Sequence, residues 1–224
     1  MKRLSIVFAL SLLCAVAGAQ DMIPAYDWAN FGRYAASSQA LRGSAPLAVI
    51  MGDSITDGWA DADSAFFAGN RLVGRGISGQ VTAHMLVRFR RDVLDLAPEY
   101  VVIIGGINDI ARNLGYISPE NTMGNIASMC ELAASHGIKP ILSTVVPTDS
   151  IAWRKGLTGV PELIQELNGR IRCYASENGF RLIDFAALMA DEDGVQKPGL
   201  TKDGIHPTPE GYKLMEEAVL QVLE

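Results

Sequence analysis

The sequence predicts an α/β domain of three layers, in which helices cover both faces of a parallel sheet. Short apolar runs rich in β-branched residues recur along the chain, and stretches with helical periodicity separate them. Strands that alternate with helices are joined by crossover connections, which make neighbouring strands parallel. Two of the runs are continuously apolar, as is typical of strands that are covered on both faces. The 224 residues, about half of them apolar, can form a full core without metals or disulfides.

Five apolar runs predict a mainly five-stranded sheet, with strands at residues 47–51, 71–74, 100–104, 138–146 and 181–184. Helical patterns lie between these runs and after the last one, at about residues 80–96, 119–136, 160–178 and 209–223. Ser118 and Pro119 are a typical cap and first-turn proline for the second of these helices, and Gly137 ends it. Aromatic residues at near-helical spacing in residues 21–45 predict a leading helix that packs on the domain.

The first nineteen residues have the layout of a secretory signal peptide. Lys2 and Arg3 precede a mostly apolar run, and the small residues 17–19 form a cleavage site. The ~14 apolar residues are fewer than the ~20 that a membrane-spanning helix needs. We therefore expect residues 1–19 to be removed, and residues 20–224 to form a single domain that is periplasmic or secreted.

A lipoprotein signal with an acylated Cys14 is the alternative, although Leu13 stands where a small residue is expected. The two other cysteines, Cys130 and Cys173, lie in helical patterns among apolar neighbours. We interpret them as buried, small apolar side chains, and a disulfide between them is the alternative. Neither has an adjacent histidine that would indicate a metal site or a nucleophile.

The charge of the chain argues against some classes of partner. The net charge is −6, and removal of the signal peptide would take away two of the 19 basic residues and none of the 25 acidic ones, which gives −8. Such a balance argues against a general nucleic-acid binder or a binder of anionic membranes. No stretch after the signal peptide is long enough to span a bilayer, so we expect no stable membrane insertion. Nothing in the pattern indicates an oligomeric state.

Polar and glycine-rich segments directly follow the predicted strands. The first strand leads into Gly52, Asp53 and Ser54, the second into residues 76–80, and the third into residues 105–109. Ligands of parallel α/β sheets bind beyond the carboxyl ends of the strands, so we expect these segments to form one site. Taken alone, each has another interpretation, because Asp and Ser also cap helices, and Gly and Asn are common in turns.

The loop before the last predicted helix completes a set of residues suited to acyl transfer. A serine hydroxyl such as that of Ser54 is a poor nucleophile until a base accepts its proton, and histidine does so near neutral pH. Asp203 stands three residues before His206, within reach of its second ring nitrogen. A glycine within residues 76–80 lets a backbone N–H approach a substrate oxygen, and the Asn108 amide offers another donor to the developing oxyanion.

These blocks resemble the four blocks of the SGNH, or GDSL-type, hydrolase family: Gly52–Asp53–Ser54, Gly79, Gly106–Ile107–Asn108–Asp109 and Asp203–x–x–His206. The resemblance spans residues ~47 to 210 and implies a flavodoxin-like α/β/α sandwich without a metal or an organic cofactor. It implies Ser54 as the nucleophile, His206 as the base and Asp203 as the residue that orients it. It also implies an oxyanion hole formed by the N–H groups of Ser54 and Gly79 and by the side chain of Asn108. For Asp57 and Asp109 it implies no fixed role, and we expect them to cap loops.

The resemblance further implies a carboxylic ester hydrolase that forms an acyl-enzyme on Ser54. Residues 26–31 and 52–59 are also similar to exported members from gut bacteria, which often remove short acyl groups from carbohydrates. We therefore expect a small-molecule or glycan ester as substrate, with Trp153 and Arg154 in the loop of residues 147–159 contacting it. A lysophospholipase or acyl thioesterase with the same site is the alternative, and a non-catalytic binding module is a more remote one.

Overall fold

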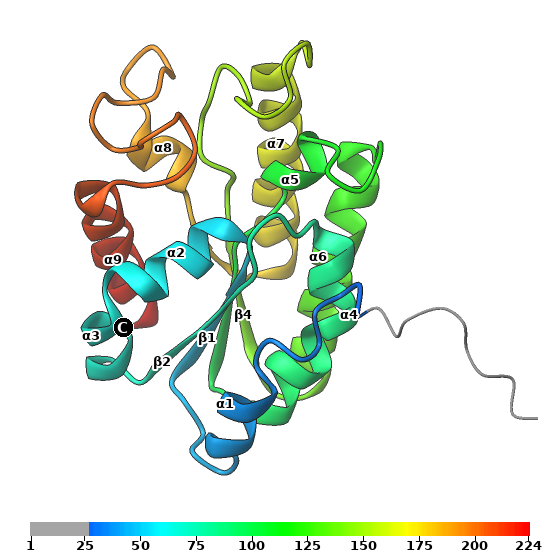
Figure 1. The fold of residues 1–224 in the computed structure, drawn as a ribbon, viewed down its shortest axis with the longest axis vertical. Helices are drawn as coiled ribbons and strands as arrows, with labels where there is room; N and C mark the ends of the chain where they lie inside the picture. The colour runs from blue at the N-terminus through cyan, green and yellow to red at the C-terminus, as the bar shows by residue number, and fades with distance from the viewer. Residues whose placement is uncertain (1–26) are drawn as a thin grey trace, which may run out of the picture.

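The computed structural model describes residues 27–224, and its centre is a five-stranded sheet (Figure 1). The predicted signal peptide, residues 1–19, lies outside the described residues. The strands are β1 (Ala48–Gly52), β2 (Leu72–Gly76), β3 (Tyr100–Ile103), β4 (Lys139–Ser143) and β5 (Arg181–Ile183). All neighbours pair in parallel, in the order β2-β1-β3-β4-β5, so the predicted flavodoxin-like sandwich is confirmed.

Helices cover both faces of this sheet. In chain order they are α1 (Ala35–Ala40), α2 (Ser54–Ala62), α3 (Ser64–Gly69), α4 (Thr82–Asp92), the 3-10 turn η1 (Leu94–Leu96), α5 (Ile107–Ile110), α6 (Pro119–Ser135), α7 (Val160–Asn178), α8 (Phe185–Met189) and α9 (Pro209–Leu223). Figure 1 shows α4, α6 and α7 side by side on one face and α2, α3, α8 and α9 on the other. The four predicted helices are found as α4 with η1, α6, α7 and α9.

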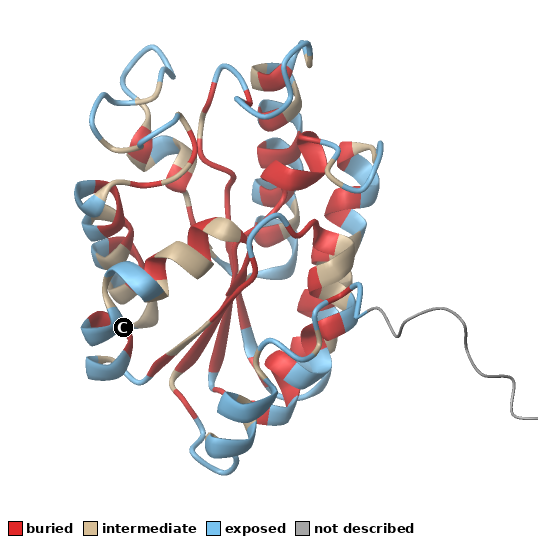
Figure 2. Cartoon of the chain, viewed as in Figure 1, coloured by how far each residue is buried: buried red, intermediate tan, exposed pale blue. Residues whose placement is uncertain are grey.

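The burial of the strands explains why their sequences are continuously apolar. Every residue of β1 and β3 is buried, and Figure 2 shows these strands enclosed between the two helical layers. The fourth strand ends at Ser143, earlier than the predicted residue 146, because the chain leaves the sheet there. The side chain of Asn168 on α7 bonds both the N–H and the carbonyl oxygen of Val145, at 2.8 and 2.9 Å, in place of a neighbouring strand.

The predicted leading helix in residues 21–45 is wrong over most of its length. Only the six residues of α1 are helical, and residues 21–26 lie outside the described part of the chain. The carboxylate of Asp27 accepts hydrogen bonds from the N–H groups of Phe31 and Gly32, and Asn30 has a φ of 57°. These local bonds hold residues 27–32 in turns, which compete with a helix.

The two cysteines of the described chain are free, so the alternative of a disulfide between them is wrong. Cys130 is buried as predicted, whereas Cys173 is exposed on α7 and its thiol lies 3.1 Å from the Glu177 carboxylate. The apolar neighbours of Cys173 face the core, and the helical turn directs its own side chain to solvent. Within residues 27–224 no helix has the length and apolarity to cross a membrane.

Candidate active site

The turn after β1 places Ser54 at the carboxyl edge of the sheet. Gly52 is the last residue of β1, and a Cβ atom there would lie 2.1 Å from the Thr56 Oγ1 atom and 2.9 Å from a backbone carbonyl oxygen, so no other residue fits. Asp53 is buried and caps α2 by accepting the N–H of Ile55 at 3.0 Å. Ser54 begins the helix and remains partly exposed. The capping interpretation therefore holds for Asp53, while the Ser54 hydroxyl takes a different partner.

That partner is His206, which the fold brings from 152 positions further along the chain. The Ser54 Oγ atom lies 2.9 Å from His206 Nε2, and His206 Nδ1 lies 2.7 Å from the Oδ2 atom of Asp203. An ionised carboxylate only accepts hydrogen bonds, so Nδ1 carries the imidazole proton and Nε2 is left to accept from the hydroxyl. The three predicted residues thus form one hydrogen-bonded chain.

Asp203 organises this loop with both of its carboxylate oxygens. While Oδ2 faces the imidazole, Oδ1 accepts the backbone N–H groups of His206, at 2.8 Å, and Ile205, at 3.1 Å. Partial burial alone would raise the pKa of Asp203, but the hydrogen bonds from His206 and Ile205 outweigh it and the pKa lies below its ordinary value. Asp203 therefore stays ionised under weakly acidic conditions and keeps its acceptor for the imidazole.

The structure also brings the predicted oxyanion residues to this edge. Gly79 has a φ of +79°, which favours glycine, and the backbone N–H groups of Ser54 and Gly79 donate to no other group within residues 27–224. Asn108 is the second residue of α5 and is buried, and its Nδ2 atom donates to Asp53 Oδ2 at 3.2 Å and to the carbonyl oxygen of Gln80 at 3.0 Å. A substrate oxygen at Asn108 would therefore share an N–H with one of these acceptors.

Two buried carboxyl groups lie beneath the site. Burial raises the pKa of Asp53 to about 6, and the hydrogen bond from the Ile55 N–H and the nearby His206 only partly oppose this shift. Burial likewise raises the pKa of Asp109 to about 6, although it accepts the N–H and the hydroxyl of Thr82 at 2.9 and 2.6 Å.

Through its bonds to Thr82, Asp109 caps the start of α4, and Asp57 accepts the N–H and hydroxyl of Ser78 in the loop after β2. Asp57 and Asp109 therefore cap backbone segments, as expected, but the segments that they cap lie more than twenty residues away in the sequence.

Trp153 and Arg154, predicted to contact the substrate, lie at the rim of the site. The Trp153 ring centroid is 6.0 Å from that of His206, and the ring is 41% exposed. The indole Nε1 donates to Asn113 Oδ1 at 3.1 Å, and an Arg154 Nη2 atom donates to the carbonyl oxygen of Arg112 at 3.0 Å. The sequence reasoning missed Asn113, because an asparagine two residues before a glycine in a short loop has the pattern of an ordinary turn.

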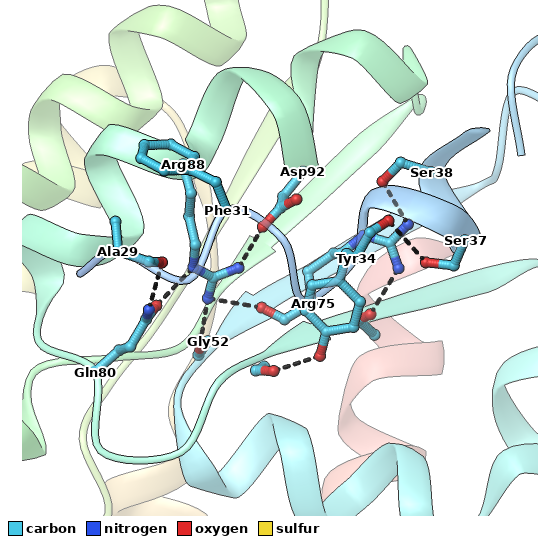
Figure 3. A network of polar contacts seen from close by, with 12 residues as sticks. Ala29, Phe31, Tyr34, Ser37, Ser38, Gly52, Arg75, Gln80, Arg88 and Asp92 are labelled. Carbon is cyan, nitrogen blue, oxygen red and sulfur yellow. Dashed lines mark hydrogen bonds and ion pairs between the residues drawn. The ribbon is translucent and has the colours of Figure 1, made fainter. Parts of the chain in front are cut away.

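Arg88, on α4, is the second residue that the sequence reasoning missed. Its guanidinium is fully buried and donates to the carbonyl oxygens of Gly52 and Arg75 at 2.8 and 2.9 Å, to Gln80 Oε1 at 2.6 Å and to Asp92 at 2.7 Å (Figure 3). Arg88 thus links Gly52, which precedes Asp53 and Ser54, to Gln80, which follows Gly79. The i,i+4 pair of Arg88 with Asp92 in the sequence was the available signal, but such pairs are usually exposed.

The fold and the site together define an α/β/α protein in which a serine, a histidine and an aspartate form one hydrogen-bonded chain. The protein belongs to the GDSL-like lipase/acylhydrolase family, whose sequence model matches residues 50–214. The family predicted from the sequence is therefore confirmed, and with it a hydrolase that acts on esters.

Individual relatives agree with this assignment. A GDSL-like lipase from Bacteroides thetaiotaomicron VPI-5482 is 42% identical and has a TM-score of 0.83, with 87% of this chain and 97% of that chain covered. A protein from Bacteroides fragilis NCTC 9343 described as an acylhydrolase is 40% identical, with a TM-score of 0.84 and coverage of 88% and 97%. The uncharacterised lipoprotein YqeF of Bacillus subtilis (strain 168) is 26% identical over 173 residues, which are 66% of this chain and 71% of that protein.

Proposed function

We propose that the protein is a serine carboxylic ester hydrolase that works through an acyl-enzyme on Ser54. The observation that carries this proposal is the chain of short contacts from Ser54 Oγ through His206 to Asp203. His206 Nε2 accepts the hydroxyl proton as Ser54 Oγ bonds to the ester carbonyl carbon. The resulting imidazolium is stabilised by Asp203 and then gives its proton to the departing alcohol oxygen. Water, deprotonated by the same nitrogen, then bonds to the acyl carbon. The bond from that carbon to Ser54 Oγ breaks, Ser54 Oγ takes the proton back from His206, and the acid is released.

The oxyanion of both tetrahedral intermediates is held by hydrogen-bond donors at the strand ends. In this proposal the N–H groups of Ser54 and Gly79 supply two donors and the Asn108 side chain supplies a third. No step requires a metal ion or an organic cofactor, and every proton passes between Ser54, His206, the leaving alcohol and water.

For the substrate we propose an ester of a short acyl group with a polar alcohol such as a sugar. A groove for a long acyl chain would draw on the large apolar residues near the site, of which Trp59, Phe66 and Phe67 are the aromatic ones nearest to Ser54 in the sequence and Leu114 and Trp153 lie in later loops. The first three are buried and pack on one another. Arg154 and the exposed ring of Trp153 instead give the rim a mixed polar and aromatic character, which suits a sugar alcohol.

A panel of substrates tests this proposal. We expect p-nitrophenyl esters of two to four acyl carbons to be cleaved with a higher kcat/KM than esters of ten or more, and acetylated sugars to be deacetylated. Each CH₂ buried in a groove would add about 0.8 kcal/mol of binding, so rates that climb up to ten or twelve carbons would instead favour a lysophospholipase or thioesterase. Absence of p-nitrophenol release above background for every ester would favour a binding module.

We also propose that the protein is exported after removal of residues 1–19. The name of the B. subtilis relative supports export, and it also keeps acylation of Cys14 as a second candidate. Mass spectrometry of the protein recovered from a bacterial host separates the two. A mature chain that begins at Gln20 supports the signal peptide, a lipid-modified Cys14 supports the lipoprotein, and a chain that retains Met1 contradicts both.

A further inference from the structure

The carboxamide of Asn113 lies between the rim of the site and two predicted oxyanion residues. Its Nδ2 atom donates to Asn108 Oδ1 at 2.8 Å and to the carbonyl oxygen of Gly79 at 3.2 Å. Its Oδ1 atom accepts from Trp153 Nε1 at 3.1 Å and from Arg154 Nη2 at 3.5 Å. One side chain therefore contacts the loops after β2, β3 and β4 at the same time.

The partners of Asn113 determine which way its amide points. An indole N–H and a guanidinium only donate hydrogen bonds, so Trp153 and Arg154 hold the oxygen of Asn113 on their side. The carbonyl oxygen of Gly79 only accepts, so it holds the NH₂ group of Asn113 on the other side. Asn108 consequently meets a donor and must turn its own oxygen to Asn113.

This orientation decides what Asn108 presents to the site. With Oδ1 bonded to Asn113, the NH₂ group of Asn108 points to Asp53 and to the carbonyl oxygen of Gln80, beside the start of α2. A rotation of the Asn108 amide by 180° would replace the donor with an oxygen, which repels a developing oxyanion. The two orientations have nearly the same shape, so hydrogen-bond partners rather than packing select between them.

We propose that Asn113 is a positioning residue of the oxyanion hole, which holds the NH₂ group of Asn108 toward the reacting carbonyl. The inference rests on the proposed function, because it assigns Asn113 a role in that same reaction. Asn113 does not contact the reacting atoms and acts through Asn108. It also joins the oxyanion hole to Trp153, so that the rim and the hole are held as one unit.

Replacement of Asn113 by aspartate or by alanine tests the proposal. An aspartate still accepts from Trp153 and Arg154, but it faces the Asn108 oxygen with another oxygen. The Asn108 amide then loses its donor on that side, and only the acceptors Asp53 and Gln80 still hold its NH₂ group in place. We expect N113D to lower kcat by about 100-fold and N113A by about 10-fold, with KM changed less than about threefold. Asn113 is only partly buried in a surface loop, so both variants are expected to fold. Equal losses in the two variants, or losses that follow the drop in melting temperature, would overturn the proposal.

A double-mutant cycle asks whether Asn113 acts through Asn108. If it does, N113D added to N108A causes no further loss of kcat, whereas independent roles give multiplied losses. The matched control is N178D, because the Asn178 amide also donates to an oxygen acceptor but lies at the far end of α7. We expect N178D to retain the kcat of the wild type. Failure of a fluorophosphonate, a reagent that bonds to activated serines, to label Ser54 in the wild type would refute the proposed function. Multiplied losses in an enzyme that is labelled at Ser54 would refute only the role of Asn113.

Discussion

Replacement of Asp203 by asparagine changes one atom and is expected to inactivate the enzyme while the loop keeps its shape. The Oδ1 atom of Asp203 accepts the N–H groups of Ile205 and His206, and an asparagine oxygen can keep both bonds. Its NH₂ group must then occupy the place of Oδ2, 2.7 Å from His206 Nδ1. Two N–H groups cannot face each other, so the imidazole proton moves from Nδ1 to Nε2.

This change of tautomer removes the base. In D203N the Nε2–H group of His206 donates to the Ser54 hydroxyl and cannot accept its proton. We expect kcat to fall by about 10³- to 10⁴-fold, which corresponds to about 4–5.5 kcal/mol in the activation barrier. The variant D203A is the control for the loop, because it also loses the two backbone hydrogen bonds and is expected to be less stable than D203N.

Steady-state kinetics with p-nitrophenyl acetate and thermal unfolding of both variants measure these effects. D203N is expected to unfold within about 2 °C of the wild type. A D203N enzyme that folds normally and retains more than a tenth of the wild-type kcat would refute the reasoning, since Asp203 would then not determine the tautomer of His206.

Two further predictions concern the buried groups that support the site. R88K keeps a positive charge on α4, but one ammonium group cannot reach the oxygens of Gly52 and Gln80 together, so we expect it to lower the free energy of unfolding by about 2–4 kcal/mol in urea titrations. An unchanged urea midpoint would contradict this prediction. In the native state burial raises the pKa of Asp109 from 3.8 to about 6. Between these pH values the native state therefore binds more protons than the unfolded state, and the free energy of unfolding falls as the pH rises. D109N is expected to reduce this fall by up to about 1.4 kcal/mol per pH unit, as measured by urea unfolding at pH 4, 5 and 6.5, and equal slopes in variant and wild type would argue against a raised pKa.

The sheet and the convergence of the candidate site residues could be predicted from the sequence because each depends on a rule with few exceptions. β1 and β3 are covered on both faces, so burial leaves a continuous apolar run in the sequence. Parallel strands end at one edge, so the residues that follow them converge there although Ser54 and His206 are far apart in the chain.

The features that the sequence did not reveal depend on particular side-chain hydrogen bonds, one of them local and the others between distant segments. Residues 27–34 have helical spacing of aromatics, but the Asp27 carboxylate bonds the backbone of the next turn and overrides that pattern. Arg88 is charged and lies on a helix, which indicates an exposed position, yet four oxygens from β1, β2, the loop after β2 and α4 itself surround it in the core. Asn113 becomes recognisable only when Trp153, Asn108 and Gly79 are seen around it.

Labelling with a fluorophosphonate tests the central claim, that Ser54 is the nucleophile, most directly. The reagent forms a bond to the oxygen of an activated serine, and mass spectrometry of peptides locates the adduct. We expect a single adduct on Ser54 in the wild type, none in S54A, and a loss of about 10³-fold or more in the kcat of S54A with the fold retained. An adduct on another serine, together with an S54A enzyme that still hydrolyses esters, would contradict the account.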